Sequence, residues 1–335
     1  MKFIRRLSFQ TLLIFLILTL AACGGSQSDP SSGGGAVAPA SLCVSSSCGV
    51  KTRLLDIPGA ENTLFTPDGR LFVSGTQNTY EITKDAAGFH ARPLFSGTCN
   101  FMGLAQVEET LYAACSSDMQ LYAANLTNAM PVLAPIYHLA GFAMPNGMAA
   151  GLSGELYLAD GPLSTQPKIV RLQIDPDDPT KVVGQDDWLQ FSTTFPNGVV
   201  RVGNTLYITL STLVPLLLGE VATIGIQPDG SPGTLQEFGT VGLSLPDDLS
   251  IVGDQVLVAL YSEGAIALVG SGGVTAQTDP LSFSFPSSIK PGRAPMFVPT
   301  DLVVTEKGPP EVSIPPGLPG GALLGNALSL FQKSQ

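Results

Sequence analysis

The sequence has 335 residues, of which 13% are charged, and a formal net charge of −11, with 16 Lys and Arg against 27 Asp and Glu. So acidic a chain is a poor partner for nucleic acid and for anionic lipid head groups, because both repel a negative surface. The length is large for one ordinary domain and favours a repetitive or barrel-like architecture, while 37 Gly and 27 Pro indicate many turns.

Residues 1–22 have the pattern of a cleavable signal peptide. Lys2, Arg5 and Arg6 precede an uncharged stretch over 7–20 that is too short to cross a bilayer as a mature helix. The stretch ends in LAAC, which resembles the lipobox of bacterial lipoprotein precursors. The resemblance implies cleavage before Cys23 and acylation of that cysteine, so that the protein is held at a membrane by its lipid. An uncleaved N-terminal anchor is the alternative.

Residue Gly24 follows the cysteine where aspartate would change the sorting of Gram-negative lipoproteins. Similarity to that sorting system implies the outer membrane of a Gram-negative bacterium. Residues 23–42 are rich in Gly, Ser, Pro and Ala, so they bury little apolar surface and are predicted to form a flexible tether.

Four further cysteines lie in a chain that is expected to leave the reducing cytosol. Two disulfides are predicted, and proximity along the chain favours Cys43 with Cys48 and Cys99 with Cys115 among the three pairings. Zinc binding is the weaker alternative, because the spacings are not those of paired CxxC knuckles and neither histidine is near in sequence.

A strand-like apolar run recurs along residues 43–308. The runs follow tight turns at intervals of 40, 45, 50 and 50 residues, and they begin at Leu71, Leu111, Leu156, Leu206 and Val256. A period of 40 to 50 residues with about four strands is typical of a β-propeller blade. The sequence therefore predicts an all-β, six-bladed β-propeller. A β-sandwich with coincidental spacing is the alternative, and a parallel α/β sheet is excluded because no helical segments separate the strands.

Ring closure is expected to involve both ends of the domain. Residues 51–57 are predicted to form the outer strand of the last blade, and the segment from Pro299 onward to form its inner strands. Residues 309–335 are a Pro- and Gly-rich C-terminal segment that is a candidate to complete this blade.

An oxygen-bearing residue precedes each recurring run by nine to eleven positions. These residues are Glu61, Asn100, Asn146, Asn197 and Asp247, with Thr300 offered by the sixth blade. The innermost strands of a propeller run alongside its axis, so equivalent positions converge on one mouth of the channel. Two carboxylates and neutral amides suit a divalent cation, above all Ca²⁺, and the lack of histidine and thiolate disfavours zinc and copper. The alternative is that these are ordinary turn residues.

The segments that carry this pattern resemble the SMP-30, gluconolactonase and LRE-like family, which is related to the paraoxonases. They are GAENTLFTPDGRLFVSG, MPNGMAAGLSGELYLAD, FPNGVVRVGNTLYITL and LPDDLSIVGDQVLVAL. The resemblance implies a six-bladed propeller in which Glu61, Asn197 and Asp247 bind a central divalent ion and Asn146 lies beside the ion and the substrate. The chain departs from the family at two points. Glu61 is followed by Asn62 and Thr63 rather than the Gly, Pro and aromatic residue frequent in the family, and Asn146 lacks the following Asp of the NDG motif.

Family members commonly hydrolyse lactones or related esters, which implies such a substrate here. A cation would polarise a carbonyl and acidify water, and Asp247 is the expected general base, with Asp248 as an alternative. Two other readings stay open: a binding module for a protein or glycan with a structural ion, and a metal-free relative of strictosidine synthase. His138 is considered as an acid or base at the mouth, and Trp188 as packing rather than a substrate platform.

Overall fold

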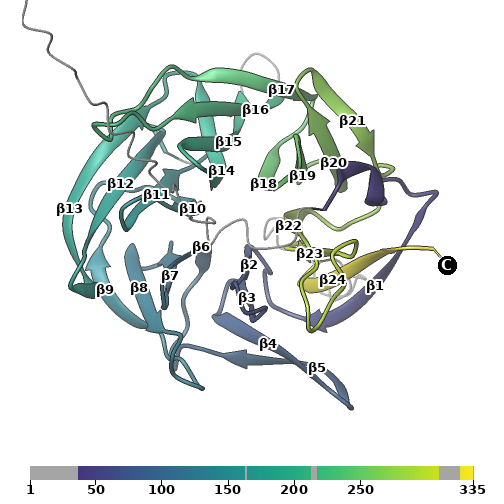
Figure 1. The fold of residues 1–335 in the computed structure, drawn as a ribbon, viewed down its shortest axis with the longest axis horizontal. Coiled ribbons are helices and arrows are strands. Elements are labelled where there is room, and N and C mark those ends of the chain that lie inside the picture. The colour runs from purple at the N-terminus through teal and green to yellow at the C-terminus, as the bar shows by residue number, and fades with distance from the viewer. Residues whose placement is uncertain (1–36, 163, 213–216, 309–324, 335) are drawn as a thin grey trace, which may run out of the picture.

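The computed structural model describes residues 37–162, 164–212, 217–308 and 325–334. Cys23, the expected signal peptide and most of the expected tether lie outside these residues. Within them, the strands form six antiparallel sheets of four strands each, arranged around a centre (Figure 1), and no α-helix occurs in the described part of the chain. The predicted all-β, six-bladed β-propeller is confirmed.

Each blade begins with its strand nearest the axis. The strand bounds of the first three blades are β2 (Thr63–Phe65), β3 (Leu71–Ser74), β4 (Thr79–Asp85) and β5 (Gly88–Pro93); β6 (Phe101–Val107), β7 (Thr110–Cys115), β8 (Gln120–Asn125) and β9 (Ala134–His138); and β10 (Pro145–Ala150), β11 (Glu155–Asp160), β12 (Lys168–Asp175) and β13 (Asp178–Gln190). Blades four and five comprise β14 (Thr194–Val202), β15 (Thr205–Thr212), β16 (Leu218–Gly225) and β17 (Gln236–Gly242); and β18 (Pro246–Val252), β19 (Gln255–Leu260), β20 (Ala265–Gly270) and β21 (Gly273–Gln277).

The sixth blade joins the two ends of the domain. Its order is β22 (Pro286–Pro291), β23 (Leu302–Glu306), β24 (Ala327–Lys333) and β1 (Gly49–Asp56). The expected outer strand is thus present as β1. The expectation that the inner strands start at Pro299 is wrong for the innermost one, because β22 begins at Pro286 and Pro299 lies between β22 and β23.

The apolar runs form the second strands of the blades and are buried on both sides. In β7, Leu111 and Ala113 face the core shared with blade one, whereas Tyr112 and Ala114 face the core shared with blade three. Side chains of a strand alternate between the two faces of a sheet, so a strand packed between two blades needs apolar residues at every position. Six such clusters lie between neighbouring blades in the described structure.

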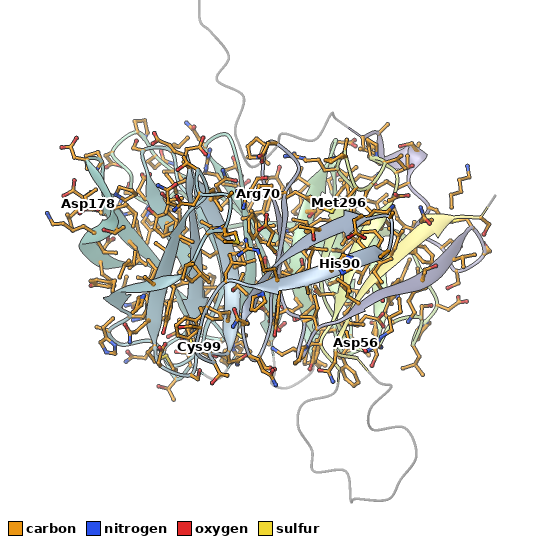
Figure 2. All side chains as sticks on the ribbon, turned by 90° about the horizontal axis from the view of Figure 1, so that it is seen from below. Asp56, Arg70, His90, Cys99, Asp178 and Met296 are labelled. Atoms are coloured by element: carbon orange, nitrogen blue, oxygen red, sulfur yellow. A yellow bond between two sulfur atoms is a disulfide. The ribbon has the colours of Figure 1, made fainter. Side chains whose placement is uncertain are left out.

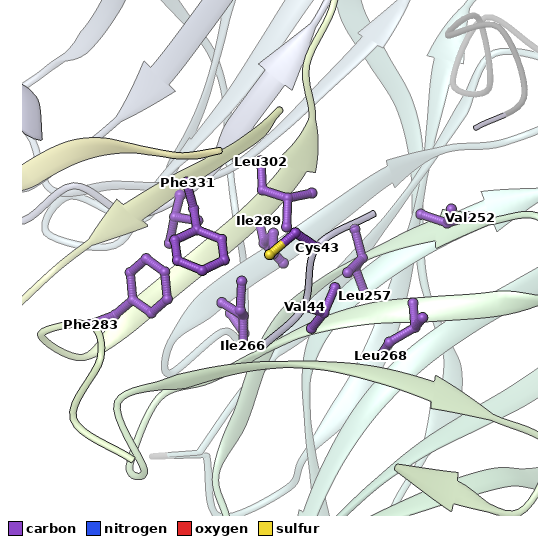
Figure 3. Close-up of a cluster of buried hydrophobic side chains, with 12 residues drawn as sticks. Cys43, Val44, Val252, Leu257, Ile266, Leu268, Phe283, Ile289, Leu302 and Phe331 are labelled. Atoms are coloured by element: carbon purple, nitrogen blue, oxygen red, sulfur yellow. The ribbon is translucent and has the colours of Figure 1, made fainter. Parts of the chain in front are cut away.

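The N-terminal end of the domain covers one of these clusters, between blades five and six. Cys43 and Val44 pack there with Leu257, Ile289 and Phe331 (Figure 3). The predicted disulfides Cys43–Cys48 and Cys99–Cys115 are both present and confirmed. The last residues of the expected tether also pack on the domain, with a 3-10 turn, η2 (Pro39–Ser41), between Val37 and Leu42.

The two faces of the propeller differ in their connections. We call ring face the side on which the innermost strands begin; Asp56 and Cys99, which precede two of those strands, lie toward it at the bottom of Figure 2. On the opposite side, the turn face, tight turns place Gly69, Gly154, Gly203 and Gly253 at positive φ, which glycine tolerates best. No helix among the described residues is long and apolar enough to cross a membrane.

Candidate functional site

The innermost strands share one irregularity at their first residues. Between the paired residues Pro145 and Met148, two residues of β10 lie opposite one residue of β11, and one extra residue also follows Phe101, Pro196, Pro246 and Pro286. Bulges of this kind are common beside functional sites because they re-aim a side chain. The residue directly after Phe101 or after each of these prolines therefore has an equivalent position in its blade. In blade one it is Glu61, two residues before the paired Thr63.

This register defines a ring of six positions on the ring face: Glu61, Met102, Asn146, Asn197, Asp247 and Ser287. Glu61, Asn146, Asn197 and Asp247 are thus brought to the equivalent positions that the sequence predicts. Asn100 is wrongly placed by the prediction, because it lies two residues before Met102, whose side chain is fully buried. Thr300 is wrong as well: it is exposed in the connection between β22 and β23, and Ser287 takes its place.

Glycines behind the ring positions let the inner strands approach one another. A Cβ atom on Gly103 would lie 2.1 Å from the carbonyl oxygen of Asn146, and one on Gly147 would lie 2.4 Å from that of Asn197. Neither distance is sterically allowed, so the glycines of this motif serve close packing of neighbouring blades around the axis. The residues before these glycines, Met102 and Asn146, are consequently held near the channel.

Hydroxyl groups of three second strands fix the backbone of the ring. Thr209 Oγ1 accepts a hydrogen bond from the Gly198 N–H of its own blade and donates one to the carbonyl of Asp247 in the next. Thr305 does the same between the Ser288 N–H and the carbonyl of Glu61. Ser74 links the Asn62 N–H to the Met102 carbonyl. Two of these three links hold the two acidic ring residues.

A lysine lies beside the ring carboxylates. Lys307, directly after β23, places its ammonium against Oε2 of Glu61, and the two side chains are 22% and 5% exposed. Burial alone would lower the pKa of Lys307, but Glu61 and Asp247 raise it above its usual value. The three charged groups therefore form one cluster at the mouth of the channel.

Asp247 is buried and electrostatically unfavourable as a carboxylate. Burial raises its pKa well above the usual range and Glu61 raises it further, whereas Lys307 and a 2.7 Å hydrogen bond from Ser287 Oγ to Oδ2 lower it. Tyr261 lies beside this cluster: burial raises the pKa of its phenol, and Asp247 and Glu61 add to the effect. Its hydroxyl donates to the Gly308 carbonyl at 3.2 Å.

The neighbouring Asp248 has a different environment. Its Oδ2 accepts hydrogen bonds from Ser288 Oγ at 2.7 Å and from the Lys290 ammonium at 2.9 Å, and its side chain is 4% exposed. Both donors contact the same oxygen and hold Asp248 in a buried ion pair with Lys290, which gives this carboxylate a structural role.

The oxygens of the ring suit a hard divalent cation. The buried Oδ1 of Asn197 has no hydrogen-bond partner among the described residues, and Glu61 and Asp247 supply two carboxylates. A buried amide oxygen without a donor is costly unless a ligand satisfies it, and carboxylate and amide oxygens are the ligands that Ca²⁺ prefers. The donor set therefore fits such an ion, with the difference that Lys307 already contacts Glu61.

Apolar side chains precede the ring positions. Met144, Phe195, Leu245 and Phe285 each lie two residues before a ring residue and are partly buried. The Phe285 ring lies 5.1 Å from that of Tyr261. We call these four residues the collar; its surface is uncharged.

A cavity of about 460 Å³ occupies the channel on the turn-face side of the ring. Its walls begin one residue beyond the ring, at Asn62 and Asp248, and are largely apolar, with Arg201, Lys290 and Arg293 among the lining residues. Burial lowers the pKa of Arg293. The channel thus has an acidic end and a more basic one.

The remaining candidates lie away from the mouth. His138 is exposed at the end of the outer strand β9, so the interpretation of it as a catalytic acid or base at the mouth is wrong. Trp188 packs against Tyr157 and donates to the Gly230 carbonyl, as expected of a packing residue. Cys99 and Cys115 lie near Asp118, but their sulfurs form a disulfide and are not free metal ligands.

Sequence reasoning did not find Lys307, Ser287 or Tyr261. The FPSS segment at 285–288 repeats the spacing of FPNG and LPDD and is the signal that places Ser287. Lys307 and Tyr261 each follow the second strand of a blade, on the ring face. The search for ring residues counted positions at the start of the inner strands and therefore missed both.

Comparisons with known proteins bear on the fold. No family model and no curated protein matches the chain. Among solved structures, a gluconolactonase from Xanthomonas campestris has a TM-score of 0.61 at 15% identity, covering 85% of this chain and 90% of its own. A putative gluconolactonase gives 0.62 at 13% identity, with coverages of 89% and 97%. A luciferin-regenerating enzyme gives 0.60 at 13% identity, with coverages of 85% and 95%.

Identities this low concern architecture alone. The chain shares the six-bladed propeller fold of gluconolactonases and of the luciferin-regenerating enzyme, and the resemblance expected from its sequence is confirmed at that level.

Proposed function

We propose that the protein is a hydrolase of lactones or esters that acts at the ring face, with a divalent metal ion, Ca²⁺ foremost, as its cofactor. The observation that carries the proposal is the buried pair of Glu61 and Asp247, which act electrostatically on one another, with the unpartnered amide oxygen of Asn197 at an equivalent ring position. The likeness in fold to gluconolactonases supports it.

Glu61, Asp247, Asn146 and Asn197 would hold the ion. When bound, a divalent ion supplies Lewis-acid polarisation of a substrate carbonyl and makes nearby water more acidic. The residues of the chain do the rest. The amide of Asn146 forms no hydrogen bond within the described residues and is available to orient a substrate oxygen.

Asp247 is the proposed general base. Ser287 occupies its Oδ2, which leaves Oδ1 to take a proton from water. The water oxygen then bonds to the carbonyl carbon, the ester C–O bond breaks, and the departing oxygen receives the proton that Asp247 took from water.

The collar favours an uncharged substrate. Its four apolar side chains precede the ring positions of blades three to six, so a neutral lactone or ester with apolar substituents fits better than an anion, which the two carboxylates repel.

A direct test uses purified protein, its metal content, and a panel of lactones and esters with and without chelator. Metal-dependent turnover should be lost in Asp247→Asn and retained in Asn100→Ala, which alters a neighbouring amide outside the ring. Metal retained without turnover on any substrate would instead support a binding module with a structural ion. Equal turnover in Asp247→Asn and the unaltered protein would contradict the assignment of the base.

We further propose, from the sequence, that a lipid on Cys23 places this domain at the cell envelope. Replacing Cys23 with alanine should move the protein from the membrane to the soluble fraction. An unchanged distribution would refute the lipid anchor.

A further inference from the structure

We propose that the ammonium of Lys307 is the built-in cation of the ring and competes with a divalent metal ion for the carboxylate of Glu61. The inference rests on the metal site proposed above and states how the protein regulates it. In the competing state, the lysine neutralises Glu61; in the metal-bound state, the lysine has moved away.

The first support is the position of the ammonium. The ammonium contacts Oε2 of Glu61, which has the same ring position in blade one as Asp247 has in blade five. Both carboxylates act electrostatically on the ammonium. Lys307 therefore already lies where a positive charge is needed. An ordinary surface lysine would keep its ammonium in water, because desolvation is unfavourable.

The second support is the fixed backbone beneath the lysine. Its N–H donates to the Phe285 carbonyl at 3.1 Å, and the next residue, Gly308, donates to Ser284 at 3.2 Å and accepts from Tyr261. The first two bonds continue the pairing of β23 with the start of β22. The lysine is thus presented by the sheet, and only its side chain has to move for an ion to enter.

The third support is the balance of charge. The ring offers two carboxylates, and the ammonium of Lys307 acts on both of them. The carboxylate of Asp248 also acts on Asp247, but it is already paired with Lys290. A divalent ion added beside the ammonium would place three positive charges against two negative ones, in a site where water screens them poorly. When Lys307 withdraws, two positive charges face two negative ones, and Oε2 of Glu61 becomes free to bind the ion.

The test compares Ca²⁺ binding to purified full-length protein and to Lys307→Met by titration calorimetry, with metal content as a second readout. The variant removes the charge and keeps the length of the side chain. We expect Lys307→Met to bind Ca²⁺ at least tenfold more tightly. Lys307→Arg should bind as weakly as the unaltered protein. The double variant Asp248→Asn, Lys290→Met, which removes the neighbouring ion pair without changing the net charge, should not change the affinity.

A measurement on the unaltered protein covers the case in which Lys307→Met does not fold. The rate at which a dilute acetylating reagent modifies Lys307, followed by mass spectrometry, should rise several-fold when Ca²⁺ saturates the protein. The rate of acetylation of Lys290 should stay the same. A rate at Lys307 that Ca²⁺ leaves unchanged would overturn the proposal, as would equal or weaker Ca²⁺ binding by Lys307→Met.

The outcome is separable from that of the proposed function. Turnover of lactones that needs metal, combined with an affinity that Lys307→Met does not improve, would leave the hydrolase standing and remove the competition. Tighter Ca²⁺ binding by Lys307→Met without turnover on any substrate would support the competition and remove the hydrolase.

Discussion

Ser287, in the first residues of blade six, donates a hydrogen bond of 2.7 Å to Oδ2 of Asp247 in blade five. Both side chains are buried, so the serine fixes how the carboxylate of the neighbouring blade is oriented. A group that orients a reacting carboxylate can influence turnover without touching the substrate.

Replacing Ser287 with alanine should lower kcat on a lactone or ester about tenfold with little change in KM, because the carboxylate loses its orientation rather than the substrate its contacts. Ser287→Thr should restore most of the rate. Ser244→Ala is a matched control, since the buried hydroxyl of Ser244 has no hydrogen-bond partner among the described groups. A fall in kcat of the same size in both serine variants would argue for a general loss of structure.

The hydroxyl of Thr209 joins blades four and five beneath the ring. Thr209→Val should lower the free energy of unfolding by about 1–3 kcal/mol, since the Gly198 N–H and the Asp247 carbonyl both lose a buried partner. Urea unfolding measures the change. Thr205→Val, on the same strand, should stay within about 0.5 kcal/mol. Equal stability of the two variants would show that the link contributes nothing.

The pair of Asp248 and Lys290 should matter for stability rather than for chemistry. Asp248→Asn leaves the partly buried ammonium without its carboxylate, and we expect a loss of about 2–4 kcal/mol, at the low end because Lys290 is 19% exposed. The double variant Asp248→Asn, Lys290→Met should recover part of the loss, as a double-mutant cycle would reveal. Turnover abolished in Asp248→Asn at full folding would instead make Asp248 the base.

The two disulfides should differ in their contribution. Cys99–Cys115 closes 16 residues and Cys43–Cys48 closes 5, so loop entropy predicts about 3 and about 2 kcal/mol respectively. Double alanine variants of each pair, unfolded in urea under identical conditions, test the order. The prediction fails if loss of Cys43–Cys48 proves the more damaging.

Glu220 on β16 should make stability depend on pH. Burial, together with Glu237 on β17, raises the pKa of Glu220 in the folded protein. The folded state therefore binds this proton more tightly than the unfolded state, and the contribution of Glu220 to stability falls as the pH rises above the unfolded pKa.

Glu220→Gln should accordingly raise Tm at pH 7, with the gain disappearing near pH 4, where the unaltered side chain is also neutral. Thermal unfolding at both pH values measures the effect. A gain of the same size at both would show that the charge of Glu220 is not its cause.

The repeated segments made the fold and four ring positions predictable. Asn146, Asn197 and Asp247 follow a buried proline in PNG or PDD, and the same bulge places each of them toward the axis. Glu61 lacks the proline and was found from its distance to the next strand. Local sequence was sufficient here because each blade repeats the same strand and turn.

The errors at Asn100 and Thr300 have a common physical cause. Counting back from a strand accepts any polar residue within the allowed interval, whereas the bulge admits one position only, which Met102 and Ser287 occupy. Lys307 could not be predicted in this way, since its contact with Glu61 joins residues at opposite ends of the domain.

The mixed origin of blade six also orders events during synthesis. Glu61 emerges from the ribosome early, but β24 must be made before it can pair with both β1 and β23, and Lys307 leaves the ribosome only shortly before β24. Until then, the nascent chain carries the acidic half of its centre without the basic half, and a truncated product lacking β24 would leave two strand edges open to other chains.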